Sequence, residues 1–335
     1  MLETLLTRTA AVGSAYFQRA GTAYVARAAT GVMPIGSAMD AVLAHGLPDE
    51  LPLIQALIER ANPHFFDDTN MAPAATGFAE LGIVSLAAAP VYSPSGVLLG
   101  AFLMHTFEQH DWTVHEQQLF SALSHILAHL TARLVAEEQV RLAHDAAIRA
   151  LGLALEYRDS ETKGHTDRVT MLAVQIGEDL GLPDTEMTAL RWGAYLHDIG
   201  KLTTPDQILH KPGPLDDQEW RIMREHTVMG DRFTAELLFM PAQARALVRS
   251  HHERWDGRGY PDGLAGSEIP LVARIFSLCD VYDALTSERP YKRAWPHDAA
   301  LAELARGAGT QFDPDLVDRF LCLAHTTCIR ELPST

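Results

Sequence analysis

The longest uninterrupted helical signal in the chain lies at residues 113–158 and separates the sequence into two halves. This stretch contains no proline, and Gly152 is its single glycine. Thr113 and Glu116 have the spacing of a capping box, which marks the start of a helix. Apolar residues recur at steps of three and four, as one helix face requires; they are Phe120, Leu123, Leu127, Leu130 and Leu134. The pattern predicts one long helix, or two nearly continuous ones.

A chain of 335 residues exceeds the size at which one hydrophobic core usually keeps growing, so two domains are expected. We predict an α+β domain at residues 1–112, a connecting helix at 113–144 and an all-α domain at 145–335. The length of the helix favours pairing with the same helix of a second copy, which predicts a homodimer. A helix packed only on its own domain is the alternative.

Strand-like patterns appear in the first domain alone. They lie at residues 23–29, 82–91 and 97–107, and the last two flank the turn sequence YSPSG, a hairpin signal. The segment LAAAPVYSPSGVLLGAFLMHT, followed by FEQHDWTVHEQQLFSALSHILA, resembles a GAF domain. The resemblance implies a central antiparallel sheet with helices and a small-molecule ligand, which the sequence does not identify. No cysteine precedes Cys279, so a bilin attached through a cysteine of this domain is excluded.

The remaining features of the chain concern its compartment. Residues 1–30 carry Glu3 inside their first apolar run, which is unlike a secretory signal and favours an amphipathic first helix. The apolar stretch at 82–104 is interrupted by prolines, so no membrane insertion is expected. The three cysteines form no CxxC pair, which favours a reducing compartment and a cytoplasmic protein; they are Cys279, Cys322 and Cys328.

The formal net charge is −16, from 43 acidic and 27 basic residues. A protein that grips a nucleic acid polymer neutralises many phosphates with lysine and arginine, so this class of partner is excluded. A small anionic ligand is compatible with the charge, because metal ions and a few local cations can bind it.

Histidines and carboxylates recur through the second half with a spacing that a polynuclear metal site explains. Glu161 and His165 are four residues apart and would share one helix face. His197 and Asp198 end an apolar helical run, and Gly200 breaks it. Imidazole with carboxylate suits Fe, Mn, Zn or Co, whereas a structural zinc site usually contains thiolates and a calcium site contains oxygens. The candidate ligands are Glu161, His165, His197, Asp198, His226, His251, His252 and Asp280.

Isolated histidines more often lie in a core than on a metal, so His125 and His129 are not assigned. Four segments together are more specific, and they resemble the HD-GYP family of HD phosphohydrolases over about residues 145–325. These segments are RDSETKGHTDRV (158–169), HDIGK (197–201), HHERWDGRGYP (251–261) and ARIFSLCDVYDALTSERPYKRA (273–294).

The resemblance implies hydrolysis of cyclic di-GMP to pGpG and onward to GMP by two or three divalent metal ions, iron or manganese. It implies His197, Asp198, His226, His251, His252 and Asp280 as ligands, with Glu161 and His165 added where a third metal binds. Asp198 would bridge the metals. Lys201 would stabilise the phosphoryl charge or the leaving group.

Five further residues are candidates for contact with the substrate. Asp283 is a second-shell or substrate-positioning candidate, and a surface salt bridge explains it almost as well. Tyr260 would shape the pocket from the glycine-rich loop. Arg289 and Lys292 would meet phosphates or guanine edges. Arg274 would do the same or form a pair on the helix surface.

The sequence thus predicts a two-domain signalling enzyme in which a GAF sensor regulates a cyclic di-GMP phosphodiesterase. Two alternatives stay open. One is hydrolysis of another cyclic dinucleotide, such as cyclic GMP-AMP. The other is an interaction module that recruits partners such as diguanylate cyclases, although such a role does not require eight metal ligands.

Overall fold

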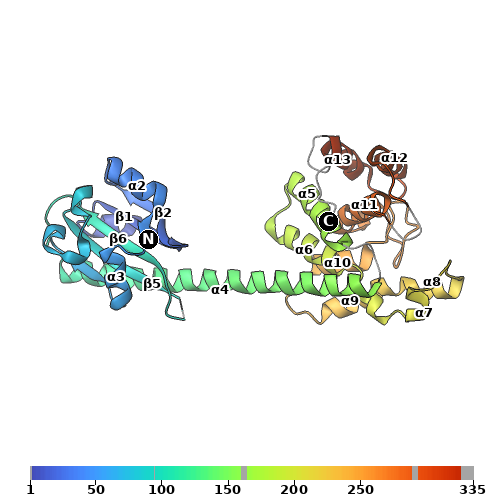
Figure 1. Ribbon diagram of the computed structural model, residues 1–335, viewed down its shortest axis with the longest axis horizontal. Helices are drawn as coiled ribbons and strands as arrows, with labels where there is room; N and C mark the ends of the chain where they lie inside the picture. Colours follow the sequence, from blue (N-terminus) through green and yellow to red (C-terminus); the bar gives the residue numbers. More distant parts are fainter. Residues whose placement is uncertain (1, 94, 160–163, 289–292, 326–335) are drawn as a thin grey trace. The chain divides into compact units, whose positions relative to one another are not determined.

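The computed structural model describes residues 2–93, 95–159, 164–288 and 293–325. The chain folds as two compact units, Met1–Arg141 and Leu142–Thr335. The first contains a sheet with helices, and all regular elements described in the second are helices (Figure 1). The predicted order, an α+β unit followed by an all-α unit, is confirmed.

A six-stranded antiparallel sheet forms the centre of the first unit, in the order β3-β2-β1-β6-β5-β4. The strands are β1 (Gly13–Ala20), β2 (Ala23–Gly31), β3 (Leu47–Pro48), β4 (His64–Phe66), β5 (Ser85–Tyr92) and β6 (Leu98–Thr106). β5 pairs with β6 in antiparallel register, with Ala88 opposite Leu103, so the predicted hairpin is confirmed.

The first helix expected at the N-terminus is present but short, and the strand predicted at residues 23–29 is confirmed as part of β2. Helix α1 (Leu2–Arg8) ends early, and the chain then forms β1 and β2 around a turn at Gly21, whose φ is 66°. β1 pairs with β2 on one side and with β6 on the other. Ladder pairing with a strand some 85 residues downstream overrides the local helical pattern, because strand preference depends strongly on cross-strand packing.

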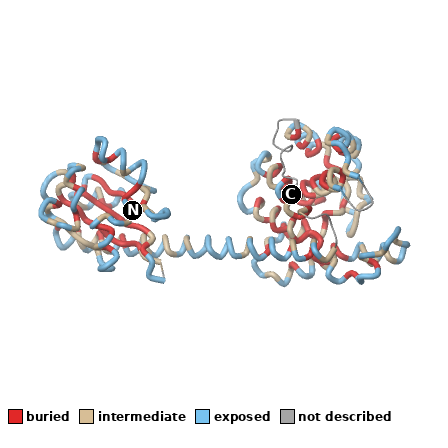
Figure 2. The backbone as a smooth tube through the Cα atoms, viewed as in Figure 1, coloured by how far each residue is buried: buried red, intermediate tan, exposed pale blue. Residues whose placement is uncertain are grey.

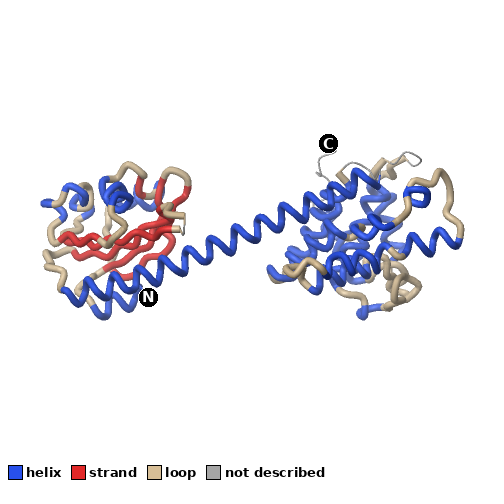
Figure 3. The backbone as a smooth tube through the Cα atoms, turned by 90° about the horizontal axis from the view of Figure 1, so that it is seen from below, coloured by secondary structure: helices blue, strands red, loops and turns tan. Residues whose placement is uncertain are grey.

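The two faces of the sheet carry separate cores because side chains alternate along each strand. Ala88 packs with helices α2 (Ser37–His45) and α3 (Pro52–Glu59) on one face. Its neighbours Ala87 and Ala89 pack on the other face with Leu5 of α1 and Phe120 of α4 (Val114–Asp159). Figure 3 shows α4 running along this second face.

α4 is one continuous helix, which confirms the prediction of a single long element. The predicted capping box is present: the Thr113 amide donates to Glu116 Oε2 at 3.0 Å, and the Glu116 amide donates to Thr113 Oγ1 at 3.3 Å. Its middle is largely exposed (Figure 2), and the Ile126, Leu130 and Leu134 side chains face solvent. By length and composition alone, α4 also satisfies the criterion for a membrane span, which no segment had been predicted to do.

The second unit packs its helices around α11, whose Phe276 is fully buried in the main core. The helices that follow α4 are α5 (His165–Asp179), α6 (Asp184–Leu196), α7 (Asp206–Leu209), α8 (Asp217–Arg224), α9 (His226–Ala235), α10 (Ala242–Ser250), α11 (Leu271–Thr286), α12 (His297–Gly307) and α13 (Pro314–His325). The 3₁₀ turn η4 (Ile199–Thr203) lies against α9, and a Cβ at Gly200 would stand 1.8 Å from the His226 carbonyl oxygen. Glycine therefore permits the close approach that sets Asp198 beside His226.

Candidate metal centre

Seven of the eight predicted ligands converge in the second unit, from α5, the end of α6, the start of α9, the end of α10 and the middle of α11. They form two groups in which the ligand atoms lie within 4.8 Å of one another: Asp198, His226, His251 and His252, and His165, His197 and Asp280. Glu161, the eighth, lies outside the described residues.

Asp198 stands between the two groups. Its Oδ2 is 3.1 Å from Nε2 of His197, and its Oδ1 is 3.3 Å from Nε2 of His226 and 3.8 Å from Nε2 of His251. Oδ1 is buried and has no hydrogen-bond partner among the residues that the structure describes. A buried carboxylate oxygen without a donor is costly unless a cation meets it. The position suits a carboxylate that bridges two metal ions.

The histidines are oriented as metal ligands. Nδ1 of His197, His226 and His251 lies 2.8, 2.7 and 2.8 Å from a backbone carbonyl oxygen three residues earlier. Since a carbonyl oxygen only accepts, each Nδ1 carries the proton and each Nε2 presents a lone pair. Nε2 of His226 and Nε2 of His251 lie 3.3 Å apart, so two lone pairs face each other. A cation at this point relieves their repulsion.

Burial keeps these imidazoles neutral. It lowers the pKa of His226 and lowers the pKa of His252 to about 3. Burial first, and the neighbouring imidazoles second, hold the pKa of His251 well below its usual range. A neutral imidazole is the form that binds metals, so the ligands require no deprotonation near neutral pH.

Lys201 reaches the same centre. Its Nζ lies 2.6 Å from Asp198 Oδ2 and 2.5 Å from Asp159 Oδ2. Burial opposes ionisation of Asp198, but the charge of Lys201 outweighs it and holds the pKa of the carboxyl well below its usual range. The two predicted catalytic residues, Asp198 and Lys201, are therefore in direct contact. Asp159 was not predicted, although it lies in the motif that contains Glu161.

Asp283 lies behind His165 and faces away from solvent, with 3% of its surface exposed. Its Oδ2 is 2.8 Å from His165 Nδ1, and its Oδ1 accepts from Arg168 Nε at 2.6 Å. His165 Nε2 then faces Asp280 Oδ1 at 3.5 Å. Of the interpretations left open by the sequence, the second-shell role is the one that this geometry supports. Arg168 was missed, because its partner is 115 residues away.

Of the remaining residues predicted to contact the substrate, the structure brings Tyr260 to the centre but not Arg274. The Tyr260 ring lies 4.8 Å from the His252 ring, at the edge of the centre. Its loop is held by Glu253, whose carboxylate accepts the backbone N–H groups of residues 262–264. Arg274 is not brought to the centre: its Nη1 pairs with Asp313 Oδ2 at 2.5 Å. Arg289 and Lys292 lie outside the described residues.

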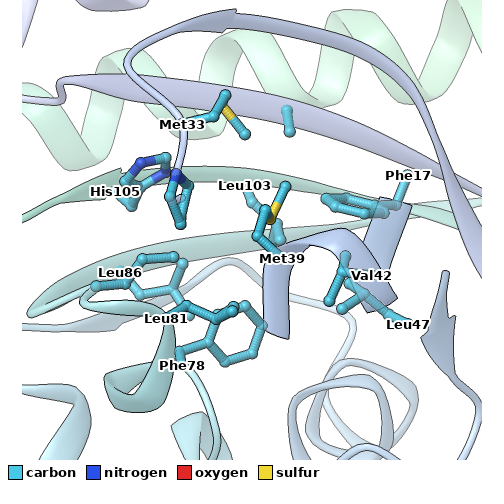
Figure 4. A pocket seen from close by; sticks show the side chains of 13 residues that line it. Phe17, Met33, Met39, Val42, Leu47, Phe78, Leu81, Leu86, Leu103 and His105 are labelled. Atoms are coloured by element: carbon cyan, nitrogen blue, oxygen red, sulfur yellow. The ribbon is translucent and has the colours of Figure 1, made fainter. Parts of the chain in front are cut away.

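A second candidate site is a small apolar pocket in the first unit (Figure 4). Phe17, Met39, Phe78 and Leu103 are among the side chains that line it, and none of its lining residues is Asp, Glu, Lys or Arg. His105 is its polar ring; Nε2 lies 3.1 Å from the Val32 carbonyl oxygen, and burial lowers its pKa. The pocket is therefore uncharged near neutral pH.

Comparison with known families agrees with both halves of the structure. Residues 2–129 match the GAF domain model and residues 150–316 match the HD domain model. The chain is a GAF domain followed by an HD domain. The expected resemblances to these two families are thereby confirmed.

The chain is similar to several proteins that are named as phosphodiesterases. It is 43% identical over 194 residues to the cyclic di-GMP phosphodiesterase response regulator RpfG of Xanthomonas campestris pv. campestris, covering 57% of this chain and 51% of that protein. It is 41% identical over 180 residues to a cyclic di-GMP phosphodiesterase of Thermotoga maritima, covering 52% and 48%. It is also 39% identical over 175 residues to the 3′3′-cGAMP-specific phosphodiesterase 2 of Vibrio cholerae, covering 51% and 33%.

The chain thus spans about half the length of the first two of these relatives and a third of the last. Among solved structures, a cyclic GMP-AMP phosphodiesterase of V. cholerae, V-cGAP3, aligns with a TM-score of 0.45 and 22% identity, covering 55% of this chain and 49% of that one.

Proposed function

We propose that the HD domain is a metal-dependent phosphodiesterase that hydrolyses cyclic di-GMP to pGpG or GMP. The observation that carries the proposal is the buried Asp198 carboxylate, with one oxygen facing each ligand group and Oδ1 without a donor in the described part of the chain. Relatives that are about 40% identical over half of the chain bear the same activity in their names, which supports the choice of substrate.

Two or three divalent ions, iron or manganese by ligand type, would be held by the two groups, and when bound they acidify water and neutralise phosphate charge. The protein supplies positioning. Backbone carbonyl oxygens hold the imidazoles of His197, His226 and His251 in place before substrate arrives. The Lys201 ammonium, held between Asp159 and Asp198, is placed to donate a hydrogen bond to a phosphoryl or leaving oxygen.

The test uses protein prepared without oxygen, with metal content and hydrolysis of cyclic di-GMP and cyclic GMP-AMP measured together. We expect about two or three ions per chain and faster turnover of cyclic di-GMP. Asp198→Ala should abolish both metal retention and turnover, while His125→Ala, on the exposed surface of α4, should change neither. Faster turnover of cyclic GMP-AMP would instead support the alternative substrate. Full metal content without hydrolysis of either nucleotide would support an interaction module, with diguanylate cyclases as partners.

We further propose that the chain is a homodimer through α4. Leu130 and Leu134 are 46% and 65% exposed on one helix face, and a second copy of the same face would cover them. Light scattering of the wild type should give the mass of two chains, and Leu130→Glu with Leu134→Glu should give the mass of one. A wild-type monomer contradicts the proposal. A cytoplasmic location, suggested by the cysteines, is tested by fractionation, which also reports any membrane association of α4.

For the GAF pocket we propose an uncharged, largely apolar ligand. A cyclic nucleotide would bury a phosphate charge against Phe17, Met39 and Leu103 with no cation to balance it. Calorimetric titration should show binding of n-decanol and no binding of cyclic GMP. Leu103→Trp, which fills the pocket, should abolish decanol binding. Binding of cyclic GMP alone would refute the assignment.

A further inference from the structure

Helix α8 carries a tryptophan and an arginine that form a series of contacts between the surface and the metal centre. The Arg224 guanidinium carbon lies 5.9 Å from the centre of the Trp220 ring and 5.1 Å from the centre of the Tyr260 ring. Tyr260 in turn lies against the His252 imidazole. Trp220 is 45% exposed, so this series begins at solvent and ends at a candidate ligand.

Arg224 contributes a positive charge beside the centre. Within the described residues it has no ion pair, whereas five other arginines of the second unit are each paired with an aspartate. These pairs are Arg168–Asp283, Arg245–Asp231, Arg249–Asp262, Arg254–Asp256 and Arg274–Asp313. In a chain with net charge −16, a cation left without a carboxylate beside the centre can meet an anionic or electron-rich ligand.

Trp220 and Arg224, together called the platform below, lie on a helix whose N-terminus is capped. Asp216 caps α8 by accepting the N–H groups of Gln218 and Glu219, and the Glu219 side chain accepts the Asp216 N–H in return. Only Glu225 separates Arg224 from His226, the first residue of α9. The position of the guanidinium is therefore tied to the position of a candidate ligand.

We propose that Trp220 and Arg224 bind one guanine base of the cyclic dinucleotide at the mouth of the metal centre. Exposed aromatic rings and guanidinium planes are surfaces on which bases stack. Arginine also donates two hydrogen bonds to N7 and O6 of guanine, whereas adenine presents an amino donor in place of O6. Trp220 thus supplies the stacking face, and Arg224 distinguishes guanine from adenine. The inference rests on the proposed function, since it names how that substrate is selected.

The kinetic experiment compares cyclic di-GMP with cyclic di-AMP, which contains no guanine. Cyclic GMP-AMP is less informative, because its single guanine could still bind to the platform. Trp220→Ala and Arg224→Ala should each raise KM for cyclic di-GMP about tenfold, the typical effect of losing one stacked base or one base contact. kcat and metal content should stay within about twofold. Arg224→Ala should also lower the ratio of kcat/KM for the two nucleotides. Arg221→Ala, on the same helix with its side chain bonded to the Asp217 carbonyl oxygen, is the matched control and should change neither value.

The binding arm uses equilibrium dialysis of cyclic di-GMP with the chelated, metal-free full chain, where no hydrolysis occurs. The wild type and Arg221→Ala should bind alike, and the two platform variants about tenfold more weakly. Equal affinity of the wild type and the platform variants, including no binding by either, overturns the platform. If the platform variants bind cyclic di-GMP more weakly than the wild type but metal-loaded wild-type protein does not hydrolyse it, the proposed function is overturned and the platform proposal stands. A fall in melting temperature without any change in KM or affinity would assign Trp220 and Arg224 to packing.

Discussion

Replacing Asp283 with Asn tests whether buried hydrogen bonds, rather than the ligands alone, set the affinity of the centre for metal. The carboxylate accepts from His165 Nδ1 at 2.8 Å and from Arg168 at 2.6 and 3.0 Å, and the first of these hydrogen bonds is fully buried. An amide of the same shape has one acceptor oxygen. If that oxygen faces Arg168, the amide N–H₂ faces His165 Nδ1, which must then give up its proton. Nε2 then becomes protonated and cannot bind a metal ion.

Loss of such an outer hydrogen bond typically weakens metal binding by about 10- to 100-fold, which is about 1.4 to 2.7 kcal/mol. We expect this weakening at the group of His165, His197 and Asp280. The group of His226, His251 and His252 should be unaffected. Competition with a chelator of known affinity, read by metal analysis, should therefore show early loss of about one ion per chain.

Asp313→Asn is the matched control, because Asp313 is as buried as Asp283 and also accepts from an arginine, Arg274, but lies outside both ligand groups. It should lower the melting temperature and leave metal affinity unchanged. If Asp283→Asn retains every ion with wild-type affinity, the idea that this carboxylate orients His165 is refuted.

Two further predictions concern positions at which the fold restricts the residue type. Glu116 has a pKa lowered to about 2, because hydrogen bonds from Ala10, Thr113 and His110 outweigh the opposing effect of burial. Its folded pKa lies below the ordinary 4.5, so its stabilisation, about 3 kcal/mol, is complete above pH 4.5 and is lost as the pH falls towards 2. Glu116→Gln should therefore lower the melting temperature of the first unit at pH 7, and this difference should shrink in acid; a difference independent of pH contradicts the reasoning. Gly200→Ala should lower stability by at least about 2 kcal/mol and reduce metal content, because the new Cβ meets the His226 carbonyl oxygen; unchanged metal content by elemental analysis contradicts this expectation.

Local sequence patterns were sufficient for several features. The capping box at Thr113 and Glu116 and the long helix after it depend on residues within a few positions of one another. The hairpin of β5 and β6 depends on one short turn between two apolar runs. Strand β1 was missed because its partner in the sheet, β6, is distant in sequence.

The sequence also predicted the types of metal ligand, because histidines and carboxylates recur in the second half with a characteristic spacing. What each donor faces was decided by packing. Asp283 meets His165 across 118 residues, and Arg274 turns to Asp313 across 39 residues, away from the centre. Arg224 meets Tyr260 through the approach of separate segments. The amino-acid types determine which chemistry is possible, while the tertiary fold determines which charges and lone pairs come together, because such contacts act over a few ångströms whatever their separation along the chain.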